Sequence, residues 1–207
     1  MIKRLLYAVK SRFLTVFGNI RTSKYPPFLF YDDVDFAMDG QHIRSALETA
    51  KPGDIVLRGY DSYLDSAFIS SSRKYSHAGI VVKNGKVVHA TAPNVCEIDL
   101  IDFMHCDRIA IVRPRKYRAA AVKIAERFRN ERTPYDFAFT HGDASLYCFE
   151  LAAYCYPKIH IEKCKATAMF GLIRKSEPVY LSDSFFSSKD MDIVFEYNPR
   201  FNIDFRA

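Results

Sequence analysis

The chain lacks any run of about 18 consecutive apolar residues, the length that a helix needs to cross a bilayer, and we therefore predict no transmembrane helix. It also lacks a typical secretory signal, because Lys10 and Arg12 interrupt the stretch that would have to form the apolar part of such a signal. We expect a cytoplasmic protein. Delivery into another cell by a dedicated secretion system needs no such signal and is compatible with this sequence.

Cysteine pairs are missing as well. The five cysteines form an odd set without a CxxC motif, which argues against a disulfide framework and favours a reducing compartment. Their spacing does not match that of zinc ligands, and His105 beside Cys106 is an isolated pair, so we expect neither a metal site nor a cofactor. The cysteines are Cys96, Cys106, Cys148, Cys155 and Cys164.

Residues 1–31 contain no acidic residue but six basic ones. Subtracting these six from the 30 lysines and arginines of the chain leaves 24, which balances all 24 aspartates and glutamates. The rest of the chain is therefore neutral. A nucleic-acid enzyme should carry basic residues over its folded surface, so we expect no nucleic-acid partner. The six residues are Lys3, Arg4, Lys10, Arg12, Arg21 and Lys24.

The same N-terminal segment carries apolar residues at spacings of three and four, which predicts an amphipathic helix with basic flanks. Two interpretations stay open: a helix packed on the body, or an anchor in which residues 1–24 lie on an anionic membrane surface. We divide the chain into this segment, 1–31, and one folded domain, 32–207. The apolar positions are Ile2, Leu5, Leu6, Val9, Phe13, Val16, Phe17 and Ile20.

The remaining pattern predicts an α+β domain in which a small antiparallel sheet or barrel, from residues 54 to 113, packs against helices. The dipeptide Asn84-Gly85 between two β-rich runs is a strong hairpin signal. Apolar periodicity and turn residues place the other elements. We expect helices at 39–50, 118–129 and 146–156, a short helix within 60–74, and strands at 55–57, 77–82, 86–90, 96–100, 108–113 and 193–197.

Cys148 stands at or near the first turn of the helix predicted at 146–156. The unpaired N–H groups and partial positive charge of a helix N-terminus favour a thiolate, so we expect a lowered thiol pKa. The same N–H groups can hold the oxyanion of a tetrahedral intermediate. The alternative is an inert cysteine of the core.

His77 opens a buried strand and is followed by Gly79, which permits close backbone approach, so His77 is a candidate base. A structural histidine is the alternative. His89 lies on the partner strand, and a two-residue turn would pair it with Ile80. That register places the two imidazoles on opposite faces, unless a bulge or a three-residue loop shifts it by one. With the shift His89 could orient His77; otherwise it is a half-exposed strand histidine.

Several short motifs together resemble the circularly permuted papain-like hydrolases of the NlpC superfamily, in which the histidine precedes the cysteine. The nearest branches look like the bacterial YiiX-like hydrolases and, more distantly, the lecithin:retinol acyltransferase group. The resemblance covers roughly 51–156, with a weaker similarity at 180–197. It rests on Pro52-Gly53-Asp54-Ile55, Ser76-His77-Ala78-Gly79-Ile80, Asn84-Gly85, Val88-His89-Ala90, Pro134-Tyr135-Asp136 and Tyr147-Cys148-Phe149-Glu150-Leu151.

This resemblance implies Cys148 as nucleophile, His77 as base and His89 as the third polar residue. Phe149 departs from the small residue usual after the nucleophile, and we interpret Glu150 as helix capping or support of the site. Tyr135 and Asp136 are candidates to line the cleft, with turn and packing roles as the alternative.

The implied activity is that of a cysteine hydrolase or acyltransferase that forms an acyl-enzyme. Its substrate would be a small molecule, peptide or lipid with an amide, ester or thioester bond near a membrane. Rival hypotheses are a non-catalytic ligand- or lipid-binding module and a membrane-surface scaffold on the same fold.

Overall fold

A computed structural model describes residues 36–61, 75–140, 142–165 and 177–199, together with residues 5, 6, 9, 12 and 13 and four short strands. The short helix predicted within 60–74 falls outside these residues except for its first two positions. The four strands form two separate antiparallel pairs, β1 (Ile20–Thr22) with β2 (Leu29–Tyr31) and β8 (Thr167–Ala168) with β9 (Ile173–Arg174).

A six-stranded antiparallel sheet forms the centre of the described domain, in the order β10-β7-β3-β4-β5-β6. The α+β class predicted from the sequence is confirmed. The C-terminal strand candidate pairs with β7 and so extends the sheet beyond the predicted 54–113 region. The strands are β3 (Ile55–Gly59), β4 (His77–Val81), β5 (Lys86–Ala90), β6 (Val95–Asp99), β7 (Arg108–Pro114) and β10 (Met191–Tyr197).

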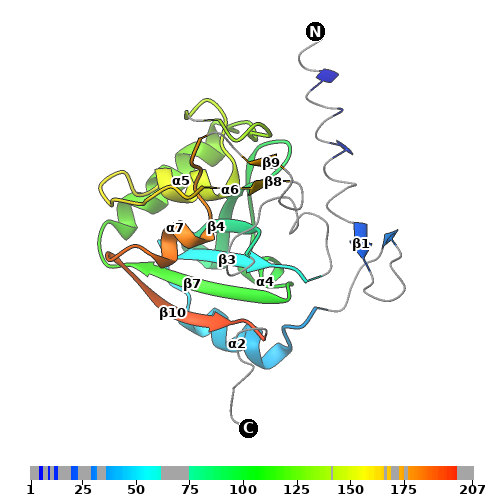
Figure 1. Ribbon diagram of the computed structural model, residues 1–207. Helices are drawn as coiled ribbons and strands as arrows, with labels where there is room; N and C mark the ends of the chain where they lie inside the picture. The colour runs from blue at the N-terminus through cyan, green and yellow to red at the C-terminus, as the bar shows by residue number, and fades with distance from the viewer. Residues whose placement is uncertain are drawn as a thin grey trace.

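Helices cover both faces of this sheet. In Figure 1, α5 (Arg118–Asn130) and α6 (Cys148–Tyr154) lie above it and α2 (Gly40–Thr49) lies below. Two short helices were not predicted: α4 (Leu100–Phe103), at the end of a strand expected to reach Leu100, and α7 (Ser182–Phe186). None of the described helices is long and apolar enough to cross a bilayer.

The two faces of the sheet bury two separate apolar clusters. Ala78 and Ile80 of β4 face the cluster under α5 and α6, which we call the α6-side cluster. Val81 of β4 and Val87 of β5 face the cluster around Phe103 and α2, the α4-side cluster. Alternate residues of the central strands β3, β4, β5 and β7 are thus buried on opposite sides, which explains why these strands are almost continuously apolar.

The β4–β5 hairpin closes through a three-residue 3₁₀ turn, η1 (Lys83–Gly85), and not through the predicted two-residue turn. Asn84 adopts a left-handed conformation with φ 59°, and the N–H of Val82 donates to the carbonyl of Lys86 at 2.8 Å. The predicted pairing of Ile80 with His89 is therefore wrong, because Gly79 is the residue opposite His89. The shift by one residue puts His77 and His89 on the same side of the sheet.

The turn before β3 is fastened to the start of α5. Gly53 has a φ of +88° and lies so close that a Cβ there would be 2.4 Å from the Arg118 Cβ. Asp54 is fully buried and accepts two hydrogen bonds from Arg113, at 2.9 and 2.7 Å, and one from the N–H of Lys51. These contacts hold the 51–54 turn against the first turn of α5.

Candidate active site

Cys148 is the first residue of α6 and is 4% exposed. Its Sγ lies 3.9 Å from the carbonyl oxygen of Ser76 and also beside the N–H of Ala78. The preceding residue, Tyr147, is the N-cap, and its hydroxyl accepts a 2.7 Å hydrogen bond from the N–H of Tyr180. The sulfur therefore contacts both peptide groups that flank His77.

The lowered thiol pKa predicted from the helix start is wrong. Burial raises the pKa of the Cys148 thiol to about 12, although the N–H groups of Ala78 and Phe149 act in the opposite direction. Desolvation penalises the charged form, and in a short helix whose first residue is buried this penalty exceeds the stabilisation by nearby N–H groups. The thiol is protonated at neutral pH.

His77 and His89 form a hydrogen-bonded pair, with His77 Nε2 and His89 Nδ1 2.8 Å apart and the rings at 84° to each other. A side chain at Gly79 would be 2.4 Å from Val87 Cγ1, so the glycine leaves the space between the strands open. Both rings pack on Phe103 of α4, with centroids 5.7 and 5.9 Å away. Pairing and packing together fix the orientation of the two imidazoles.

Both imidazoles are neutral. Burial, followed by the nearby Arg58 guanidinium, lowers the pKa of His89 to about 3. Burial is also the largest cause that moves the pKa of His77 well below its usual value, with Arg58 and His89 adding to it. Because the Nε2 of His77 is occupied by His89, Nδ1 is the ring nitrogen that remains to exchange a proton with another group.

Sequence reasoning missed three residues of this site. Arg58 pairs with His77 across β3 and β4, and its guanidinium lies 4.5 Å from the ring centroid of Phe103. Cys96, which pairs with His89 across β5 and β6, places its Sγ 3.4 Å from His89 Nε2. The signal available for Arg58 was an arginine in an otherwise apolar strand. The contact of Cys96 depends on the register of β5 and β6, and that of Phe103 depends on the four-residue helix α4.

The structure brings the side chains of the two histidines together. The Cys148 sulfur, in contrast, contacts the backbone next to His77 and neither imidazole. In the described part of the chain no hydrogen bond joins the Cys148 sulfur to either imidazole. Cys148 belongs to the α6-side cluster, whereas the imidazoles contact Phe103 of the α4-side cluster. The sulfur contacts the backbone of Ser76 and Ala78. Both residues precede Gly79, the first residue of β4 that pairs with β5.

The side chains of Phe149 and Glu150, in the first turn of α6, are both buried. Glu150 is fully buried, and burial raises its pKa to about 7, against a hydrogen bond from Tyr154. The helix start has no side-chain cap, so the capping interpretation of Glu150 is wrong. Phe149 is 1% exposed and packs near Phe185, with ring centroids 6.4 Å apart.

Tyr135 and Asp136 make turn and packing contacts in the 134–140 loop. The Asp136 carboxylate accepts hydrogen bonds from the N–H of Ala138 at 2.8 Å and from the hydroxyl of Thr140 at 3.0 Å, and Tyr135 forms an isolated bridge with Leu146 just before α6. These contacts position the segment that leads to Cys148.

An antiparallel sheet packed on a helix that opens with a cysteine, with a histidine on an earlier strand, is the arrangement of the permuted papain-like fold. A family model described as permuted papain-like amidase enzyme, YaeF/YiiX, C92 family, matches residues 49–195, and the chain belongs to this family. The resemblance to YiiX-like hydrolases is thereby confirmed.

A solved structure supports the fold independently. The crystal structure of the metalloprotein YiiX from Escherichia coli O157:H7 is similar, with a TM-score of 0.57 and 19% identity over 72% of this chain and 98% of that one. No curated protein gives a significant match.

Proposed function

We propose that the protein is a cysteine-dependent amidase with Cys148 as nucleophile, His77 as base and His89 as the residue that orients it. The observation that carries this proposal is the position of Cys148 at the start of α6, with its sulfur against both peptide groups of His77. The 2.8 Å pair with His89 gives the base a fixed ring orientation. Membership in an amidase family supports the reaction class.

The resting site is uncharged, and this determines the first step. Because Cys148 and His77 lie on opposite faces of β4, the thiol proton passes to His77 Nδ1 through a water molecule at the start of the strand as the sulfur attacks the amide carbon, so charge develops only with substrate bound. The N–H groups at the start of α6 stabilise the oxyanion, and His77 returns the proton to the leaving amine. His89, uncharged and in contact with Nε2, accepts a hydrogen bond from the imidazolium that forms. Water then hydrolyses the thioester.

The acyl group is the open part of this mechanism. Amide cleavage fits the family, and a small-molecule, peptide or lipid amide would each supply the required carbonyl. An acceptor other than water would turn the same acyl-enzyme into an acyltransferase, and an ester or thioester substrate would react by the same steps.

A metal has no part in the proposed steps. The similar structure from Escherichia coli O157:H7 is described as a metalloprotein. In the described residues of this chain, no three histidine, cysteine, aspartate or glutamate side chains are arranged to hold a metal ion. The side chains of the described residues therefore do not fit a metal centre.

The test is acyl-enzyme formation measured by intact mass. The protein is incubated with p-nitrophenyl acetate and then with a panel of acyl-amide substrates, and the adduct is mapped by peptide analysis. We expect a single acetyl adduct on Cys148 that is absent in Cys148→Ala. Cys155→Ala is the matched control, because Cys155 is a buried cysteine at the other end of α6. Equal adducts in wild type and Cys148→Ala would refute the nucleophile. Binding of substrates without any adduct or turnover would favour a non-catalytic binding module.

We also propose that residues 1–24 attach the enzyme reversibly to an anionic membrane. Residues 5, 6, 9, 12 and 13 of this segment are helical and exposed, with Leu5, Leu6, Val9 and Phe13 showing 56–66% of their surface. Ile20–Thr22 form β1, so the prediction that the helix reaches Ile20 is wrong. Each basic residue near an anionic leaflet contributes about 1 kcal/mol. Co-sedimentation with phosphatidylserine vesicles should therefore be lost when residues 1–24 are removed, and equal binding by both chains would refute the anchor. Loss of all function on that removal, with the function unchanged in Cys148→Ala, would favour a membrane-surface scaffold.

A further inference from the structure

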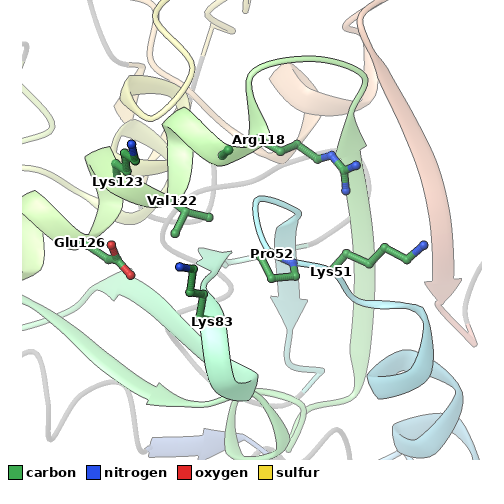
Figure 2. Close-up of a pocket in the computed structure, with 8 residues that line it drawn as sticks. Lys51, Pro52, Lys83, Arg118, Val122, Lys123 and Glu126 are labelled. Atoms are coloured by element: carbon green, nitrogen blue, oxygen red, sulfur yellow. The ribbon is translucent and has the colours of Figure 1, made fainter.

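A recess lies at the turn end of the β4–β5 hairpin, which is the end far from the two histidines. It has a volume of about 530 Å³ and is bounded by three elements: the 51–54 turn, the η1 turn and the first two turns of α5. Figure 2 shows Pro52 and Val122 in its middle, with charged side chains around them. The charged side chains are Lys51, Lys83, Arg118, Lys123 and Glu126.

Four cations and one carboxylate surround this recess, which leaves an excess of three positive charges. Lys51, Lys83 and Lys123 have no acidic hydrogen-bond or ion-pair partner among the described residues. Figure 2 shows Lys83 extending toward Glu126, so this carboxylate offsets one cation at most. The other carboxylate nearby, that of Asp54, is bound by Arg113 at 2.7 Å and reaches Arg118 only at 3.9 Å.

The backbone adds to this positive field. The N-cap of α5, Tyr117, has a φ of 66° and provides no side-chain cap, and the first turn of α5 contains no acidic residue. The helix dipole therefore adds to the charge of Arg118 and Lys123. The walls are rigid, because Gly53 packs against Arg118 and the hydroxyl of Tyr156 donates to the Gly53 carbonyl.

We propose that this recess binds a phosphomonoester. A dianion with three acceptor oxygens suits a recess that is lined by lysines from three elements and has an excess of three positive charges, whereas a single carboxylate would leave most of this charge unmatched. The apolar floor of Pro52 and Val122 would contact the carbon skeleton next to the phosphate. A phospholipid headgroup and a soluble phosphate share this chemistry. The site is separate from Cys148 and does not depend on the proposed amidase.

The test uses the full chain and two double variants with the same change of charge. Lys83→Glu with Lys123→Glu reverses two charges of the recess, and Lys165→Glu with Lys189→Glu reverses two exposed charges that do not line it. All chains keep the basic N-terminal segment, so its contribution cancels. Vesicles of phosphatidylcholine with phosphatidic acid, and glycerol 3-phosphate in solution, are the two probes.

We expect the recess variant to lose about tenfold or more in affinity for phosphatidic acid vesicles, and the control to lose much less. Competition by glycerol 3-phosphate, with shifts of the amide resonances of Lys83 and Val122, would show that a soluble phosphate also enters; vesicle binding without such shifts would assign the site to lipid.

Equal weakening of both variants, or of neither, overturns the proposal. A neutralising variant, Lys83→Gln with Lys123→Gln, provides the same comparison if the charge-reversed chain does not fold.

Discussion

The two ends of the β4–β5 hairpin differ in almost every physical property. At the end where β4 begins, His77 and His89 are packed on Phe103, the buried Cys148 thiol lies on the opposite side of the strand, and burial keeps all three groups uncharged. At the turn end, lysines are exposed around an open recess. One hairpin thus combines a desolvated end, where we propose acid–base chemistry, with a solvent-exposed end, where we propose charge recognition. Burial keeps the proposed acid–base groups uncharged, whereas the lysines at the turn are exposed, so that their charge costs no desolvation.

The largest expected effect tests the histidine end. His77→Ala should slow acylation of Cys148 by roughly 10²- to 10⁴-fold, the usual contribution of a general base. His89→Ala should cost less, on the order of tenfold, because an orienting residue acts only through the base. Stopped-flow release of p-nitrophenolate measures both rates. His160→Ala is the control, since its side chain is 86% exposed. An unchanged rate in His89→Ala would remove that residue from the mechanism.

The next effect tests what holds the turn end in place. Asp54→Ala should lower the free energy of unfolding by about 3 kcal/mol, because it leaves Arg113 without its carboxylate and frees the N–H of Lys51. Asp192→Ala breaks a similar bidentate contact to Arg115 whose side chains are half exposed, and it should lower the free energy of unfolding much less, because water screens this pair. Urea denaturation compares them. Equal losses would mean that burial does not strengthen the first pair.

A third effect is the pH dependence of stability at the histidine end. Burial raises the pKa of Glu150 from 4.5 to about 7, so the folded state holds this proton more tightly than the unfolded state. This stabilisation is fully present below the unfolded-state value and is lost as pH rises through the folded-state pKa, so we expect stability to fall by about 1 kcal/mol from about pH 6 to about pH 8. Urea denaturation at both pH values should show this loss in wild type and in the exposed control Glu48→Gln. In Glu150→Gln it should be absent, and a loss that persists there must have another source.

The smallest expected effect concerns Cys96. Its thiol lies 3.4 Å from His89 Nε2 and extends the hydrogen-bonded chain by one residue. Cys96→Ala should lower the acylation rate by only a few-fold and move the acidic limb of its pH profile, because His89 loses a polar neighbour. Cys96→Ser should restore the wild-type profile. A pH profile that stays fixed in Cys96→Ala would limit this residue to packing.

Most strands and long helices could be predicted because their burial follows local periodicity. The alternating exposure around α5 and the apolar runs of β3 and β7 follow from patterns among residues that are close in sequence. Helix α4 could not be found in this way, since four residues are too few to show a period. Cys148 and the two histidines could be singled out from chemistry and motif, but their contacts depend on how β4 and β5 pair.

The error on the thiol pKa has a related cause. A helix start is visible in the sequence, and the predicted sign of its effect on the thiol is right: the N–H groups of Cys148 and Phe149 lower the pKa of Cys148. The opposing effect is desolvation by residues distant in the chain, and no local pattern measures it. Arg58 was missed for the same reason, because its closeness to the imidazoles comes from pairing between β3 and β4.

The η1 turn has a consequence for how this protein can change in evolution. Exposed turns usually tolerate the gain or loss of a residue. Here the turn contains three residues, and that count determines which side of the sheet His89 occupies. Deleting one residue would turn every side chain of β5 to the opposite face and separate the two rings. Lineages that keep the imidazole pair should therefore conserve the length of this turn more strictly than the identity of its residues.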